Sequence, residues 1–262
     1  MSFETIDLGV DARGVATLTL ARADKHNAMS AQMIAELTEA AARIAADRTV
    51  RVVILTGAGA SFCAGGDLKW MQAQMAADPE TRYAEARKLA EMLFAMNTLP
   101  QPVIGAIQGN AFGGGLGLIS ICDVAIGVET LKLGFTETRL GLIPATISPY
   151  CLARMGEAMA RRVFMSARLF GAAEAVTLGL LAQAVPAEGL AEAIEAEVKP
   201  YLACAPSAVA ASKRLARDMG AVIDDAVIDR TIRALVTQWE TEEAKAGVAA
   251  FFDKRKAPWI QE

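Results

Sequence analysis

The spacing of apolar residues predicts three strands in the first part of the chain. Val15 to Ala21 (VATLTLA) alternates β-branched and small side chains, which is typical of a strand. Val50 to Thr56 (VRVVILT) is an almost continuous apolar run, as expected for a strand buried on both faces. Pro102 to Ile107 (PVIGAI) predicts another buried strand.

Helical spacing follows the first strand. Ser30 is a predicted N-cap for a helix through MIAELTEAAARIAAD, whose apolar stripe is Met33, Leu37, Ala41 and Ile44. A second predicted helix runs through YAEARKLAEMLFAMNTL, and we assign its stripe to the core: Leu89, Met92, Leu93 and Met96. The polar segment from Ala73 to about Arg82, which contains Asp-Pro, predicts a mobile surface segment.

The composition changes beyond Pro149, where the sequence becomes strongly helical apart from a short strand-like LAQAV. We therefore divide the chain into a core at 1–167 and an all-helical layer at 168–262. With 262 residues, the chain is long enough to bury a core without disulfides or metal.

Composition excludes several classes of function. The net charge of −4 and a pI near 5.3 argue against binding nucleic acid or an anionic membrane, and no apolar run is long enough to cross a bilayer. Four dispersed cysteines and a single histidine predict reduced thiols and no metal site. The N-terminus lacks an apolar signal segment, so we expect a cytoplasmic protein.

A glycine-rich turn, GAGASFCAGGDLKW, follows the second strand. It fails the dinucleotide fingerprint because Phe62 stands where a third glycine is required, and no G-K-[ST] follows to form a P-loop. What remains is Ala64-Gly65-Gly66 before Asp67, a predicted N-cap. Such a loop either exposes N–H donors to a negative oxygen or uses glycine only for a tight turn.

The segment GNAFGGGLGL places three glycines at a helix start, where each stabilises the helix about 1 kcal/mol less than alanine. Either a ligand or another chain segment must approach the backbone there, and we favour the ligand.

Glu137 lies among apolar residues in GFTETRLGLIPAT. Such surroundings raise the pKa of a carboxyl group and suit a residue that both takes and gives a proton near pH 7. The alternative is a salt bridge with Arg139. A third candidate, the loop with Arg22, Lys25 and His26, either holds an anion or is a solvated turn.

Taken together, these segments resemble the crotonase family, the enoyl-CoA hydratase/isomerase superfamily. The resemblance covers essentially the whole chain, and it is carried by these segments in this order: KHNAM, GAGASFCAGGDLK, GNAFGGGLGL with the following CD, LGFTETRLGLIP, AAEAVTLGLLAQAVP and FFDKRKAPW. It implies an α/β fold, a spiral of ββα turns with a helical C-terminal region, assembled as homotrimers or homohexamers.

The resemblance also implies an acyl-CoA thioester as substrate and no separate cofactor, since CoA is part of the substrate. The backbone N–H groups of Gly66 and Gly114 would form the oxyanion hole, and Glu137 would be the catalytic carboxylate. Loss of one such donor raises the barrier by about 3 kcal/mol in other enzymes. The adenine and pantetheine would lie against two loops, with Lys25 near the phosphates; the residues assigned to substrate binding are Lys25, Ala28, Ala64, Asp67 and Leu68.

One position departs from the family pattern. Hydratases of the family commonly carry a glutamate where this chain has Gly117, which leaves Glu137 alone and resembles delta-3, delta-2 enoyl-CoA isomerases. The wider segment instead resembles bacterial hydratases of branched glutaconyl-CoA type, from leucine or acyclic terpene breakdown. We therefore favour a hydratase acting on a branched or carboxylated 2-enoyl-CoA, over an isomerase and over a non-catalytic acyl-CoA binder. Gln108 and Asn110 are candidates to hold the water, or else turn residues.

Overall fold

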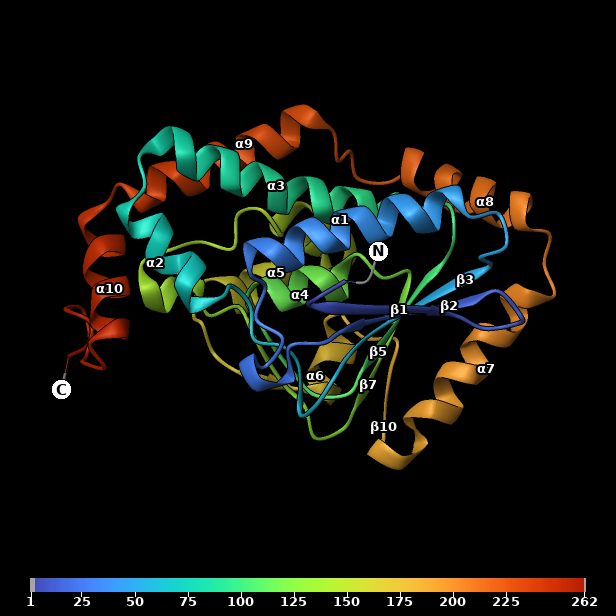
Figure 1. Ribbon diagram of the computed structural model, residues 1–262. Helices are drawn as coiled ribbons and strands as arrows, with labels where there is room; N and C mark the ends of the chain where they lie inside the picture. The colour runs from blue at the N-terminus through green and yellow to red at the C-terminus, as the bar shows by residue number, and fades with distance from the viewer. Residues whose placement is uncertain (1–2, 262) are drawn as a thin grey trace.

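The computed structural model describes residues 3–261, which form two β-sheets surrounded by helices (Figure 1). Within these residues the larger sheet has six strands: β1 (Ile6–Val10), β2 (Val15–Leu20), β3 (Val52–Gly57), β5 (Val103–Ile107), β7 (Val124–Val128) and β10 (Gln183–Val185), in that order. The smaller sheet has four: β4 (Ser61–Cys63), β6 (Asn110–Phe112), β8 (Lys132–Gly134) and β9 (Phe170–Gly171). The β1–β2 and β8–β9 pairs are antiparallel and the other pairs are parallel.

Helices connect and cover the sheets, and none within residues 3–261 is long and apolar enough to span a membrane. The α-helices are α1 (Ala31–Ala46), α2 (Leu68–Ala76), α3 (Pro79–Asn97), α4 (Gly114–Ser120), α5 (Ser148–Phe164), α6 (Ala172–Thr177), α7 (Leu190–Leu202), α8 (Pro206–Asp218), α9 (Asp225–Trp239) and α10 (Glu242–Phe252). The 3-10 helices are η1 (Ala23–Lys25), η2 (Glu137–Leu140) and η3 (Ala187–Gly189).

The chain repeats one spatial pattern three times. The strands β3, β5 and β7 lie in the larger sheet, and each is followed at once by a strand of the smaller sheet and then by helix. Because both sets of strands are parallel, successive turns stack in one direction. The predicted spiral of ββα turns is confirmed.

The strand β3 is buried on both faces, as its apolar run predicts. Its Val53 and Leu55 belong to the main core with the stripes of α1 and α3, whereas Val52 belongs to a second cluster with Ile194 and Val198 of α7. Neighbouring residues of a strand point to opposite faces. Figure 1 accordingly shows α1 and α3 on one side of the larger sheet and α7 on the other.

The segment from Ala73 to Arg82 lies mostly at the surface, as predicted, but it is helical except at Ala77 and Asp78, which separate α2 from α3. The Asp78 side chain accepts a hydrogen bond from the Thr81 N–H (2.7 Å), and Pro79 is the first residue of α3, where its missing N–H is not needed. Arg82 is buried and donates to the Gln74 carbonyl (2.7 Å). The Asp-Pro pair thus starts a helix.

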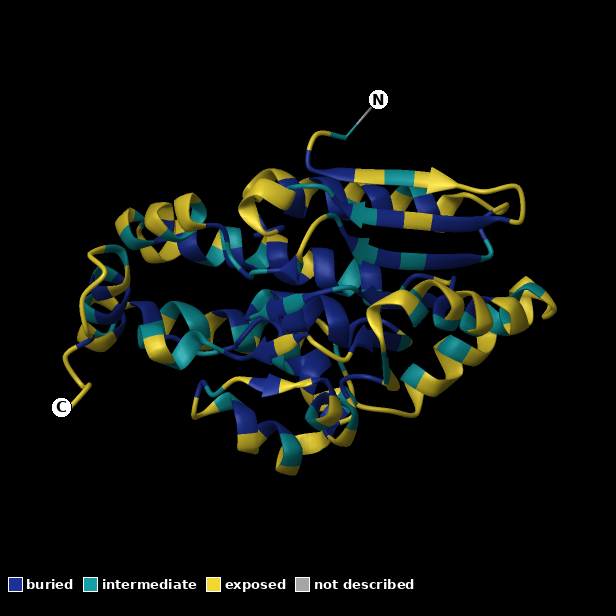
Figure 2. Ribbon diagram, turned by 90° about the horizontal axis from the view of Figure 1, so that it is seen from below, coloured by how far each residue is buried: buried dark blue, intermediate teal, exposed yellow. Residues whose placement is uncertain are grey.

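The C-terminal region is mostly helical, but it is not purely a helical layer. After Arg168 the chain adds β9, which pairs with β8, and β10, which pairs with β7. Beyond them, α9 packs on α3 and α10 packs against η2. Figure 2 shows that exposed residues gather on the outward faces of these peripheral helices, around a buried centre.

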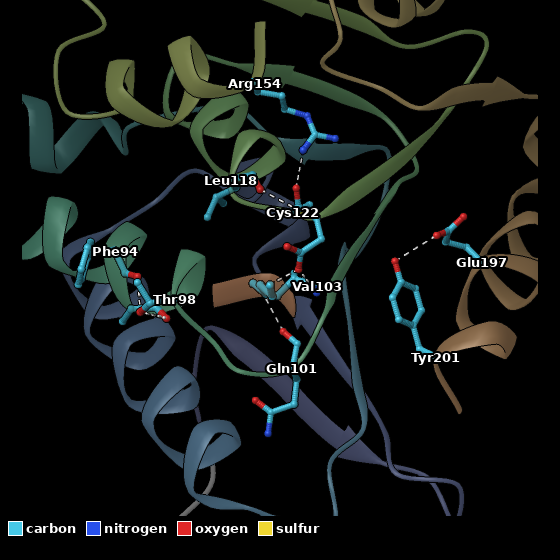
Figure 3. A network of polar contacts seen from close by, with 12 residues as sticks. Phe94, Thr98, Gln101, Val103, Leu118, Cys122, Arg154, Glu197 and Tyr201 are labelled. Carbon is cyan, nitrogen blue, oxygen red and sulfur yellow. Dashed lines mark hydrogen bonds and ion pairs between the residues drawn. The ribbon is translucent and has the colours of Figure 1, made fainter. Parts of the chain in front are cut away.

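A set of polar contacts fixes the carboxyl end of α4 (Figure 3). The Cys122 carbonyl accepts a hydrogen bond from the Arg154 guanidinium of α5, and the Cys122 thiol donates to the Leu118 carbonyl (3.2 Å).

Candidate active site

The loop after β4 presents the backbone N–H of Gly66. The Met29 N–H donates to the Gly65 carbonyl (2.7 Å), and the Asp67 N–H donates to the Met29 carbonyl (3.0 Å). These bonds leave the Gly66 N–H without a protein acceptor within residues 3–261. Gly65 makes the turn with φ of +91°, a conformation that glycine adopts readily. Gly66 can therefore donate to a ligand.

A second free N–H belongs to Gly114, the first residue of α4. Gly113 precedes it as N-cap, and the Gly113 N–H donates to the Gly134 carbonyl (3.0 Å). The first N–H groups of a helix have no intrahelical acceptor, and no described residue accepts a bond from that of Gly114. A Cβ added to Gly65 would lie 3.6 Å from the Gly114 nitrogen, so the two loops are in contact. Together the two donors can stabilise one oxyanion.

Neighbouring chain segments leave no space for side chains at two glycines of the run. A Cβ on Gly115 would lie 2.5 Å from the Cys63 carbonyl oxygen, and one on Gly114 would lie 2.3 Å from Met29 Cε. The preference for a ligand as the reason for the run is therefore corrected at these two glycines, which lack side chains because Cys63 of β4 and Met29, ahead of α1, pack directly on the start of α4. This packing is what brings the two donors together.

Glu137 lies on η2, next to the second donor. A Cβ on Gly113 would lie 3.2 Å from its Oε1, and its Oε2 is buried with no hydrogen-bond partner among residues 3–261. Burial raises the pKa of Glu137 to about 7, because desolvation disfavours the charged form. The carboxyl group can thus accept and release a proton near neutral pH.

The alternative interpretation of Glu137, an ion pair with Arg139, is wrong. The Arg139 side chain is exposed, and in the described part of the chain no charge contributes to the shifted pKa of Glu137. The two side chains occupy the same helix without pairing.

A cavity of about 520 Å³ unites these groups. Five of the predicted site residues line it: Gly66, Gly114, Glu137, Ala64 and Leu68. Among the described lining residues Glu137 is the only acid and Arg139 the only base, while most others are apolar. No three His, Cys, Asp or Glu side chains within residues 3–261 are grouped so that they could hold a metal ion.

Three predicted substrate-binding residues do not line this cavity: Lys25, Ala28 and Asp67. Lys25 is largely exposed on η1, with Asp24 at 3.5 Å. Asp67 caps α2 through the Lys69 N–H (2.8 Å) and pairs with Arg22 (2.9 Å). Burial opposes its ionisation, but these bonds hold the pKa of Asp67 below its usual range.

The cationic loop around Lys25 is also held internally. Arg22 donates to the Ala28 carbonyl (2.6 Å), and the His26 ring contacts the Ser61 hydroxyl (3.1 Å). Fully buried Asn27 donates to the Ala58 and Ser61 carbonyls. In the described structure, Arg22 and His26 are thus engaged with protein atoms, whereas the Lys25 side chain pairs only with the exposed Asp24 and remains accessible to solvent.

Gln108 and Asn110, the two polar candidates near the glycine run, form hydrogen bonds with backbone groups. Gln108 donates to the Ser61 carbonyl (2.9 Å), and Asn110 accepts from the Lys132 N–H (2.8 Å). Neither lines the cavity: Gln108 lies in the turn after β5, and Asn110 is the first residue of β6.

Residue 117, where hydratases of the family commonly carry a glutamate, is a glycine packed against Ile147. A Cβ on Gly117 would lie 2.4 Å from Cγ2 of buried Ile147. The space that a side chain at residue 117 would occupy is therefore apolar and already packed.

Sequence patterns did not predict several walls of the cavity. Aromatic and apolar side chains line it from distant elements: Trp70 and Met71 of α2, Leu235 and Trp239 of α9, and Phe251 of α10. Leu89, predicted as core, is buried and also lines the cavity. No local spacing distinguishes such residues from core residues, because their role depends on how α9 and α10 fold back.

Comparisons with known proteins agree with this geometry. The family described as enoyl-CoA hydratase/isomerase matches residues 11–262. The chain is similar to crotonyl-CoA hydratase of Syntrophomonas wolfei (30% identity, 99% of both chains) and to (E)-benzylidenesuccinyl-CoA hydratase of Thauera aromatica (30% identity, 92% of this chain and 93% of that one). Its structure resembles an enoyl-CoA hydratase from Shewanella pealeana, with a TM-score of 0.79, 34% identity, and coverage of 98% of this chain and 96% of that one.

Proposed function

The chain belongs to the enoyl-CoA hydratase/isomerase family, and from this premise we propose that it hydrates a branched or carboxylated 2-enoyl-CoA, with Glu137 as general acid and base. One observation carries the proposal. A buried carboxyl group with a pKa of about 7 shares a cavity with the N–H donors of Gly66 and Gly114.

The oxyanion donors act on the thioester carbonyl. As a nucleophile adds at C3, negative charge moves to the carbonyl oxygen, where the N–H groups of Gly66 and Gly114 stabilise it without rearranging. These donors are fixed by the packing of the loop after β4 on α4, which supplies the required preorganisation.

Glu137 moves the protons. As a carboxylate it takes a proton from water, whose oxygen forms a bond to C3 while the C2–C3 π electrons pass to the enolate. The same group then gives this proton to C2, so the product gains one water and Glu137 returns to its starting state. Because Ile147 fills the space beside Gly117, Glu137 must perform both steps.

The same observation at Ile147 favours a second candidate, isomerisation of a 3-enoyl-CoA to a 2-enoyl-CoA. There Glu137 would take a proton from C2 and return it to C4, and no water would be consumed. Proton transfer between carbons by one carboxylate needs no second group.

A panel of 2-enoyl and 3-enoyl thioesters tests these alternatives, with product mass reporting net water addition. We expect hydration of at least one branched or carboxylated 2-enoyl-CoA by the wild type. Glu137→Gln should lower the rate at least about 100-fold, whereas Glu129→Gln, the same change at an exposed position, should not. Full activity of Glu137→Gln would refute its role, and turnover of 3-enoyl esters alone would favour the isomerase.

We also propose a homotrimer or homohexamer. Large apolar side chains on and after α8 are exposed in the single chain, with Leu215 at 63% and Met219 at 81% exposure. Burial of such side chains between copies would stabilise the assembly. Sedimentation analysis tests this, and a monomer at micromolar concentration would contradict it.

A further inference from the structure

Arg139 stands out among the residues that line the cavity. It is the only basic residue among the described lining residues, and its immediate neighbours there, Leu140 and Leu142, are apolar. Its side chain forms no ion pair or hydrogen bond with any residue from 3 to 261, unlike Arg22, which pairs with Asp67 at 2.9 Å. A cation at a cavity wall without a protein partner is free to bind an anion.

The position of Arg139 relates it to the reacting atoms. It follows Glu137 by two residues on η2, which corresponds to a rise of about 4 Å along a 3-10 helix. Two residues of a 3-10 helix point about 120° apart, yet both side chains line the same cavity. A group bound at Arg139 can therefore belong to the same ligand on which Glu137 acts. When the thioester lies between Gly66 and Gly114, the CoA phosphates lie at the other end of the long pantetheine arm, whereas the acyl chain begins at the thioester itself.

The charge balance of the cavity supports an anionic acyl group. Glu137 is the only acid among the described lining residues, and in its charged form it repels a second carboxylate. A cation on the same helix offsets this repulsion. Arginine also binds carboxylates through two parallel hydrogen bonds, which fixes their orientation as well as their position.

We propose that Arg139 selects acyl-CoA substrates whose acyl chain carries a second carboxylate, which the guanidinium binds while Glu137 acts at C2. This inference rests on the proposed function and chooses the carboxylated substrate over a merely branched one. The apolar walls around Arg139 would hold the carbon chain between the thioester and the carboxylate.

Binding of unreactive saturated thioesters tests the proposal without any turnover. Glutaryl-CoA, pentanoyl-CoA and free CoA are titrated by calorimetry into the wild type, Arg139→Gln and Arg161→Gln. Arg161 is an exposed arginine outside the cavity, so its substitution is a matched change of net charge. We expect Arg139→Gln to weaken the binding of glutaryl-CoA about 10-fold or more, and the binding of pentanoyl-CoA and free CoA less than about 2-fold. Arg139→Lys should retain part of the preference for glutaryl-CoA over pentanoyl-CoA.

Three results would overturn the proposal. Equal weakening of all three ligands would assign Arg139 to CoA itself, and no weakening of any would remove it from the site. A change of oligomeric state in Arg139→Gln would assign the side chain to a contact between copies. Since Arg139 has no partner among the described residues, the melting temperature should not change.

Turnover separates this proposal from the proposed function. For glutaconyl-CoA and 2-pentenoyl-CoA, Arg139→Gln should lower kcat/KM about 10-fold for the first ester only, whereas Glu137→Gln should abolish turnover of both. If the wild type hydrates neither these esters nor any branched or carboxylated 2-enoyl-CoA of the panel, the proposed function fails, and the calorimetric result still decides the role of Arg139.

Discussion

Replacing Glu137 by glutamine should stabilise the protein, and more so at high pH than at low pH. The wild-type carboxyl group is buried, and its pKa is raised from 4.5 to about 7. In the unfolded chain it ionises near its ordinary pKa. The folded state therefore binds the proton more tightly than the unfolded state, and this contribution to stability is lost as the pH rises from about 4.5 through about 7.

The size of this change in unfolding free energy follows from the shift in the pKa of Glu137. A change of one pKa unit corresponds to 1.36 kcal/mol, so the shift of Glu137 destabilises the wild type above pH 7 by about 3 kcal/mol relative to pH 4.5. Glutamine has nearly the same shape and cannot ionise. The difference in unfolding free energy between Glu137→Gln and wild type should therefore grow by about 2 to 3 kcal/mol from pH 5 to pH 8.

Urea unfolding at pH 5 and pH 8, at one fixed protein concentration, measures this difference. Glu129→Gln serves as control, because an exposed carboxylate should show almost no pH dependence of this kind. A difference between Glu137→Gln and wild type that stays within about 0.5 kcal/mol over this range, or that reverses sign, would refute the assignment of a buried carboxyl group with a raised pKa.

Three further substitutions test the packing that positions the site. Gly117→Ala should destabilise the protein by about 1 to 3 kcal/mol through contact with Ile147; in a double-mutant cycle with Ile147→Ala, measured by urea unfolding, additive effects would argue against that contact. Asp67→Ala removes the cap of α2 and the partner of Arg22, so the unfolding free energy should fall by about 2 kcal/mol or more, and an unchanged value would contradict this role. Gly115→Ala forces the first turn of α4 away from Cys63 of β4, and kcat/KM should fall about 100-fold; wild-type kinetics would show that this close approach does not position the donors.

Much of the fold could be predicted because its strands carry strong local signals. The continuous apolar run of β3 reflects burial between two helical layers, and the stripe of α1 faces the main core as its spacing requires. The helical structure before Arg82 was not predicted because part of its support comes from distant residues, among them Glu240 directly after α9, which pairs with Arg82. Such long-range contacts leave no trace in local spacing.

The candidate site was predictable to a similar extent. Gly66, Gly114 and Glu137 are marked by glycine and by an isolated carboxylate in apolar sequence, and the structure brings all three to one cavity. The glycines were attributed to a ligand, whereas contacts such as that of Gly115 with Cys63 explain their lack of side chains. Local sequence cannot separate these causes, because both require a bare backbone.

Exchange of α-hydrogens tests the central claim most directly, since it needs neither water addition nor knowledge of the natural acyl group. Pentanoyl-CoA is incubated with the protein in D₂O near pD 7, and deuterium at C2 is followed by mass spectrometry. We predict exchange with the wild type and with Glu129→Gln, and a rate at least about 100-fold lower with Glu137→Gln. Absence of exchange with the wild type, or an equal rate with Glu137→Gln, would contradict enolate formation by Glu137 at the oxyanion donors.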